Sequence, residues 1–206
     1  MAYNEQGAWS ETCLIGVTAK DGSEVQFAAL IETVDIDMGD KDVEVIANLK
    51  GGRVIKKVPQ AETTITFEGY PIGIDASAGT GFSELFNDLA GATTIEPLTI
   101  DASLVRTLYR VAILWSTGTE TTAGAATTAS NSAYRFAAAN CYMTSYKPSF
   151  TDGILKATIS FKVAPFNRLG IAQIREESTE GTTALTVLGS YNTTNFPIDS
   201  ATAYTW

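Results

Sequence analysis

The chain has 206 residues, a formal net charge of −9 and no histidine. The missing histidine removes the commonest general base and metal ligand, and with it every Ser-His-Asp or Cys-His catalytic arrangement. The acidic balance argues against wrapping nucleic acid through phosphate contacts, although nucleic acid could still slide past without binding. Thr, Val, Ile and aromatic residues are frequent, so the composition predicts a mainly β protein that is long enough to bury one core.

Neither the cysteines nor the N-terminus points to chemistry or export. Cys13 and Cys141 lie far apart in apolar runs, so they cannot form a zinc site or a closely spaced redox pair, and we expect buried free thiols. Residues 1–10 are polar and are expected to form an N-terminal arm without a secretory signal. No apolar run approaches the length of a membrane span, so synthesis in a cytosol is expected. No catalytic, cofactor-binding or metal-binding residues are predicted.

The first elements in chain order are two strands joined by a turn. Residues 13–19 predict a first strand, and Asp21-Gly22 its turn. A second strand is expected from Val25 to Met38. Its apolar face changes phase between Ile31 and Val34, which predicts a β-bulge, because one unpaired residue reverses the alternation.

Residues 39–60 predict a long hairpin that projects from the body of the protein. Gly51-Gly52 supplies the turn, and the flanking residues are too apolar for a free linker. A phosphate-binding loop is disfavoured because the Lys-Ser/Thr of such a loop is missing. We expect this hairpin to contact a neighbouring subunit through Val43, Val45, Lys50, Arg53, Val54, Ile55, Lys56, Lys57 and Val58.

The middle of the chain predicts a strand over 64–68 and then one short helix. The helix is expected at 82–89, because Phe82, Leu85, Phe86 and Leu89 fall on one helical face. A long central strand is expected over 104–115. Residues 117–132 are rich in Thr, Ala, Gly and Ser, and we expect an exposed loop there.

The last elements are a second hairpin and a C-terminal extension. Alternating apolar residues on either side of Asp152-Gly153 predict two paired strands between residues 133 and 166. Residues 167–206 are expected to form an extension with one short strand over 184–188. Its aromatic residues imply that it docks on the protein; these are Tyr191, Phe196, Tyr204 and Trp206. The expected division is an arm over 1–10, a β domain over 11–166 and the extension over 167–206.

This order of elements resembles the major tail tube proteins of tailed bacteriophages and tailed archaeal viruses. The likeness rests on the strand 32–38, the loop 39–53, the segment Thr64-Ile65-Thr66-Phe67-Glu68-Gly69-Tyr70-Pro71, the helix 82–89 and the hairpin 142–161. It covers roughly residues 10–166. The resemblance implies a β-sandwich or small barrel with one short flanking helix, a projecting hairpin loop and extended terminal arms.

The same resemblance implies a structural role without catalysis. Such subunits join edge to edge into rings, expected to be six-membered, which stack into a tube for genome delivery in a virion tail that assembles in the host cytoplasm. The implied partners are other copies of the chain, tape-measure, terminator and baseplate proteins, and viral DNA that passes without specific binding. Because the chain is acidic, we expect acidic residues to line the channel.

Three alternatives stay open at the level of sequence. The first is a tube or terminator subunit of another phage-like machine, or a capsid decoration protein. The second is a carbohydrate-binding β-sandwich adhesin that uses Trp9, Trp115 and Trp206 as stacking platforms. The third is an enzyme that uses carboxylates such as Asp35 and Asp37, which would share one strand face.

Overall fold

The computed structural model describes residues 12–20, 24–26, 31–47, 51–69, 108–167, 170–180, 183–189 and 191. The expected N-terminal arm and the expected helix at 82–89 lie outside these residues. The strands are β1 Thr12–Ala19, β2 Glu24–Gln26, β3 Ile31–Asp37, β4 Val43–Ala47, β5 Arg53–Lys57, β6 Thr63–Gly69, β7 Tyr109–Ser116, β8 Ser132–Thr151, β9 Ile154–Val163 and β10 Ile174–Glu180. The prediction of a mainly β fold is therefore confirmed. No helix in the described part of the chain is long and apolar enough to cross a membrane.

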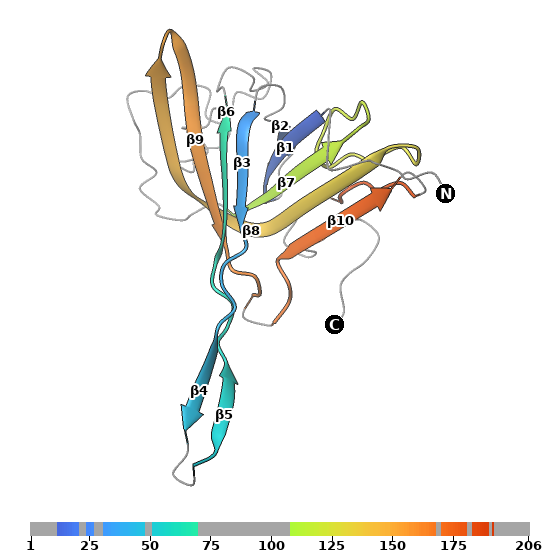
Figure 1. The fold of residues 1–206 in the computed structure, drawn as a ribbon. Helices are drawn as coiled ribbons and strands as arrows, with labels where there is room; N and C mark the ends of the chain where they lie inside the picture. The colour runs from blue at the N-terminus through green and yellow to red at the C-terminus, as the bar shows by residue number, and fades with distance from the viewer. Residues whose placement is uncertain are drawn as a thin grey trace, which may run out of the picture.

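One eight-stranded antiparallel sheet forms the body of the protein. Its strand order is β2-β1-β7-β8-β9-β6-β3, and β10 also pairs with β8. Figure 1 shows that this sheet curls into an open half-barrel, with the two-stranded hairpin of β4 and β5 projecting from one end. The curl arises in β8, which pairs with β7 and β10 in its first half and with β9 in its second half.

Several predicted strands are confirmed, and one is divided. The β8–β9 hairpin turns at Asp152 and Gly153, whose φ angles of 53° and 78° suit a tight turn. The expected bulge occurs as a register shift between Ile31 and Thr33. However, β2 pairs with β1 while β3 pairs with β6, so the expected single strand from Val25 to Met38 serves two different neighbours.

The main core lies on the inner face of the curled sheet. Alternation along each strand turns every second side chain to this face. Phe161 lies at its centre, stacked on Phe67 at a centroid distance of 6.2 Å and edge-on to Tyr109 at 6.0 Å. Other buried members are Ile15, Val17, Ile65, Val111, Ile113, Phe136, Ala138, Cys141 and Ile159.

A second, smaller core lies on the opposite face of β1, β7 and β8. Small residues of these strands, such as Ala112 and Ala137, form its floor. The loop around Ala123 and the C-terminal residues Leu185 and Leu188 cover it, and all three side chains are buried. Residues 117–132 were expected to form an exposed loop. That prediction is wrong for the buried part of the loop, because the loop and the C-terminal residues shield the same apolar floor.

The C-terminal extension joins the sheet, but not at the expected strand. Residues 174–180 form β10, whereas 184–188 are not a strand. The strand prediction failed because residues 174–180 are largely polar, and their strand state comes from pairing with β8. The expectation that the aromatic tail docks is confirmed at Tyr191, which is 1% exposed.

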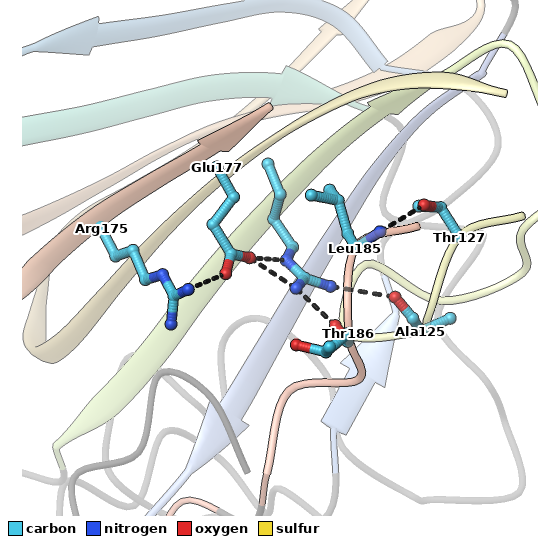
Figure 2. A network of polar contacts seen from close by, with 7 residues as sticks. Ala125, Thr127, Arg175, Glu177, Leu185 and Thr186 are labelled. Carbon is cyan, nitrogen blue, oxygen red and sulfur yellow. Dashed lines mark hydrogen bonds and ion pairs between the residues drawn. The ribbon is translucent and has the colours of Figure 1, made fainter. Parts of the chain in front are cut away.

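A buried arginine ties these covering segments to the sheet. Arg135 on β8 is fully buried and donates to Glu177 Oε2 from Nε at 2.9 Å and from Nη2 at 2.5 Å. Its guanidinium also donates to the carbonyl oxygens of Ala125 at 2.9 Å and Thr186 at 2.6 Å. Figure 2 shows this fork, with Arg175 on the far side of the Glu177 carboxylate. One side chain therefore joins β8, β10, the loop and the C-terminal segment.

Candidate functional site

The projecting hairpin, defined as β4, β5 and the residues between them, is the most exposed apolar element described. Its strands pair in a regular antiparallel register, with Val45 opposite Ile55 and Ile46 opposite Val54. Every described residue of the two strands is exposed. Six apolar side chains of the hairpin and its stem are between 39% and 67% exposed; these are Val43, Val45, Ile46, Val54, Ile55 and Val58. Exposed apolar clusters are typical of interaction surfaces, because soluble monomers seldom expose large apolar patches.

The two faces of the projecting hairpin carry different charges. Residues directly opposite each other in an antiparallel pair point to the same side. On one face, Lys57 and Arg53 flank the apolar pair of Val45 and Ile55, and no acid accompanies them. On the other face, Lys56 lies opposite Glu44. Of the four basic residues expected to act together, Arg53 and Lys57 lie on one face and Lys56 on the other, while Lys50 lies outside the described residues.

The stem of the projecting hairpin is a narrow crossing of two chain segments. The backbone N–H groups of Val58 and Ala61 donate to the carbonyls of Asp42 and Asp40, each at 3.1 Å. Gly39 lies at the crossing with φ of +73°, and a Cβ there would lie 2.7 Å from the carbonyl oxygen of Glu62. Glycine is required here both by the positive φ and by the close approach of the opposite backbone.

We expect Gly39→Ala to destabilise the protein more than Gly51→Ala, by about 1–3 kcal/mol, the usual cost of overpacking. Both glycines have positive φ, but a Cβ at Gly51 would meet nothing within 4 Å. The pair therefore separates the clash at the stem from the conformational cost that both variants share. Denaturant unfolding of the two variants measures the difference, and equal losses of stability would show that the stem tolerates the added methyl group.

Two unpaired strand edges bound one half of the sheet. In that half the order is β8-β9-β6-β3, all antiparallel. Among the described residues, no strand pairs with the outer edge of β3 or with the second half of β8 on the side away from β9. Pro148 lies in that part of β8, and proline is tolerated in strands mainly at edges because it has no N–H to donate. Exposed edges of this length are ready to pair with another chain.

The face of this half-sheet opposite the main core is polar. Cross-strand partners place Asp35 beside Thr66, and Thr66 Oγ1 lies 3.0 Å from Ser160 Oγ. The charges of this face have a small acidic excess, because Glu62 at its border pairs with Lys162; the carboxylates are Asp35, Asp37, Glu62 and Glu68, and the lysines are Lys147, Lys156 and Lys162. Asp35 and Asp37 are exposed on the edge strand β3.

The cysteines and Trp115, which could have supported an enzyme or a carbohydrate-binding protein, are packed in or beside the core. Both cysteines are free, and burial raises the pKa of Cys13 to about 11 and that of Cys141 to about 12, so neither is a reactive thiolate at neutral pH. Trp115 packs on Tyr134 at a centroid distance of 5.3 Å beside the main core. Trp9 and Trp206 lie outside the described residues. Within the described ranges, no group of three or more His, Cys, Asp or Glu residues could hold a metal ion.

The sequence predicted the projecting hairpin. It did not predict the division of charge between the faces of the hairpin, the free edge of β8 or the burial of Arg135. The division of charge between its faces needs the register, which fixes Lys56 opposite Glu44. The free edge of β8 had a signal in the sequence, namely Pro148 inside a long alternating strand. The buried Arg135 had a weaker one, since it is the only charged residue between Ser132 and Tyr146.

No protein-family model and no curated protein matches this sequence. Several solved structures are similar. A chain of the anti-feeding prophage (AFP) baseplate, 6-fold symmetrised, is 10% identical, with a TM-score of 0.46 and coverage of 85% of this chain and 98% of that chain. A chain of the sheath-tube complex of PVC, an extracellular contractile injection system, in its extended state is 14% identical, with a TM-score of 0.43 and coverage of 80% and 88%. Hcp1 from Flavobacterium johnsoniae is 13% identical, with a TM-score of 0.30 and coverage of 84% and 98%. Similarities of this size are too weak to assign a function.

Proposed function

We propose that this chain is a structural subunit that self-assembles into stacked rings, forming the tube of a virus tail or of a related phage-like machine. The observation that carries the proposal is the projecting hairpin, which exposes six apolar side chains on a narrow stem. An isolated hairpin of two strands is at best marginally stable in water, and packing against other surface would stabilise it. A second copy of the chain supplies that surface when rings stack.

The topology of the half-sheet supports ring closure. Its order β8-β9-β6-β3 contains an even number of antiparallel strands, so its two free edges run in opposite directions. Copies related by rotation about one axis would therefore bring β3 of one beside β8 of the next in antiparallel pairing. Asp35 and Asp37 at one edge and Lys147 at the other have opposite charges, which favours this joint. The resemblance implies six copies in each ring.

The same closure would turn the polar face of the half-sheet toward the channel. The opposite face packs on the main core, so the rest of each subunit must lie outside the ring. The channel wall would then carry hydroxyl groups and, among the described residues, more carboxylates than lysines, as expected for an acidic chain. Without an excess of lysine and arginine, such a wall would not hold DNA through phosphate contacts as it passes. Tape-measure, terminator and baseplate proteins would be the partners at the ends of the tube.

The experiment that tests the proposal is electron microscopy of the purified intact chain, combined with sedimentation over a wide range of protein concentration. We expect rings or tubes that increase in number with concentration. A strict monomer at high concentration would contradict self-assembly. A monomer that binds defined glycans on an array would instead support the adhesin alternative.

Reversing charge on the two faces of the projecting hairpin should have unequal effects. We expect Arg53→Glu with Lys57→Glu to weaken self-association about tenfold at low salt, because these cations flank the exposed apolar pair without an acid on the same face. Lys56→Glu should weaken it less, since Lys56 faces Glu44 of its own hairpin. Sedimentation at low and moderate salt measures both. Equal effects, or none, would show that the cations of this hairpin are only solvated.

A further inference from the structure

Strand β8 bends at Asn140, a residue with an unusual backbone conformation. Its φ is 57°, in the left-handed region that side chains other than glycine seldom adopt, although asparagine tolerates it better than most. The register of β8 with β7 shifts at the same place, between Tyr109 and Val111. Figure 1 shows β8 curving from the half of the sheet with β7 and β10 to the half with β9. Asn140 therefore lies where β8 passes from one half of the sheet to the other.

The backbone N–H and the side-chain amide of Asn140 both form hydrogen bonds with residues from the C-terminal part of the chain. The backbone N–H of Asn140 donates to Tyr191 Oη at 3.1 Å, and Tyr191 Oη donates to Asn140 Oδ1 at 2.8 Å. Asn140 Nδ2 donates to Gln173 Oε1, and the carbonyl of Gln173 accepts the N–H of Ala139 at 2.8 Å. Tyr191 and Gln173 are 1% and 2% exposed, so water does not replace these bonds.

Tyr191 is itself fixed by the segment that precedes it. We name residues 183–191 the C-terminal latch. Its backbone is anchored to the loop at two points, where Leu185 N donates to Thr127 Oγ1 at 2.9 Å and Leu188 N donates to the carbonyl of Gly124 at 2.8 Å. Arg135 and Arg110 add two further anchors, through the carbonyls of Thr186 and Gly189. Among its described residues the latch pairs with no strand, so its attachment depends on these separate contacts.

We propose that the C-terminal latch fixes the bend of β8 through the Tyr191 hydroxyl, and that losing this contact frees the two halves of the sheet to move at Asn140. The reason is that a residue other than glycine keeps a positive φ only where hydrogen bonds and packing from its surroundings stabilise that conformation. Without the hydroxyl, a partly buried N–H and a partly buried amide oxygen of Asn140 lose their partner, and other backbone conformations become competitive. Tyr191 is in this sense a positioning residue, and the role of the latch is independent of any assembly.

Cys141 offers a native reporter of the bend. Its side chain is fully buried, and its Sγ donates to the carbonyl of Ala138 at 3.4 Å across the bend. We expect Tyr191→Phe, which keeps the ring and removes only the hydroxyl, to raise the maleimide labelling rate of Cys141 about tenfold. That factor corresponds to about 1.4 kcal/mol. Mass spectrometry of proteolytic peptides taken at successive labelling times distinguishes label on Cys141 from label on Cys13, whose rate should not change.

Two controls make the result decisive. Tyr134→Phe removes a hydroxyl from the same strand without touching Asn140, and it should leave Cys141 labelling unchanged. In an Asn140→Gly background, glycine accepts the positive φ and retains only the backbone N–H that donates to Tyr191 Oη, so adding Tyr191→Phe should have a much smaller effect. The proposal is overturned if Tyr191→Phe leaves Cys141 labelling unchanged or raises the labelling of both cysteines equally. It is also overturned if the tenfold effect persists in the Asn140→Gly background.

Discussion

Replacing Ile55 with aspartate should yield a folded monomer that no longer self-associates. Ile55 is 67% exposed and lies opposite Val45 on the face of the projecting hairpin that carries Arg53 and Lys57. Burying such a side chain at a joint contributes about 1.5–3 kcal/mol, and a buried unpaired carboxylate would add a further cost. The affinity of each joint should therefore fall by more than about 100-fold. Sedimentation and electron microscopy measure the loss of rings and tubes.

The fold of the subunit should survive this change. A substitution at an exposed position away from the core usually changes the free energy of unfolding by less than about 0.5 kcal/mol. A graded series of Ile55→Val, Ile55→Thr and Ile55→Asp separates the loss of apolar area from the added charge. Association that is the same across the series would show that this face of the hairpin is not a joint. An unfolded aspartate variant would mean that the hairpin stabilises the monomer itself.

Replacing Arg135 with alanine should destabilise the subunit by about 3–5 kcal/mol, the range for removing one partner of a buried ion pair. Its guanidinium is fully buried and satisfies Glu177 together with the carbonyls of Ala125 and Thr186. Removing it would leave these oxygens buried without their donor and would open a cavity beneath the C-terminal latch. Arg135→Lys should recover only part of the loss, because an ammonium group cannot reproduce the planar fork.

The matched control for this prediction is Arg175→Ala. Arg175 pairs with the same carboxylate, Glu177, at 2.5 Å, but its side chain is 27% exposed. A partly exposed pair contributes about 0–1 kcal/mol, so the control should unfold close to the wild type. Denaturant unfolding of the three variants provides the comparison. Similar small losses for Arg135→Ala and Arg175→Ala would show that the buried fork is no more stabilising than a surface pair.

The sequence by itself determined the elements whose signals are local. Alternating apolar residues on either side of Asp152-Gly153 predicted the β8–β9 hairpin, because a period of two and a turn that needs positive φ are both properties of neighbouring residues. The projecting hairpin was predicted in the same way from Gly51-Gly52 and its apolar flanks. The absence of histidine removed whole classes of catalytic site before any fold was considered.

Only the tertiary structure decided which of these elements share a surface. Residues 174–180 are polar and had no strand signal, and they form β10 because β8 offers a free edge for pairing. The loop at 117–132 has no apolar side chain larger than alanine, and it is buried in part because Leu185 and Leu188 complete a small core with it. The pairing of Lys56 with Glu44, and the burial of Arg135, depend on register and on segments far apart in the chain. Such contacts leave no local pattern, since their partners are chosen by the fold and not by sequence neighbours.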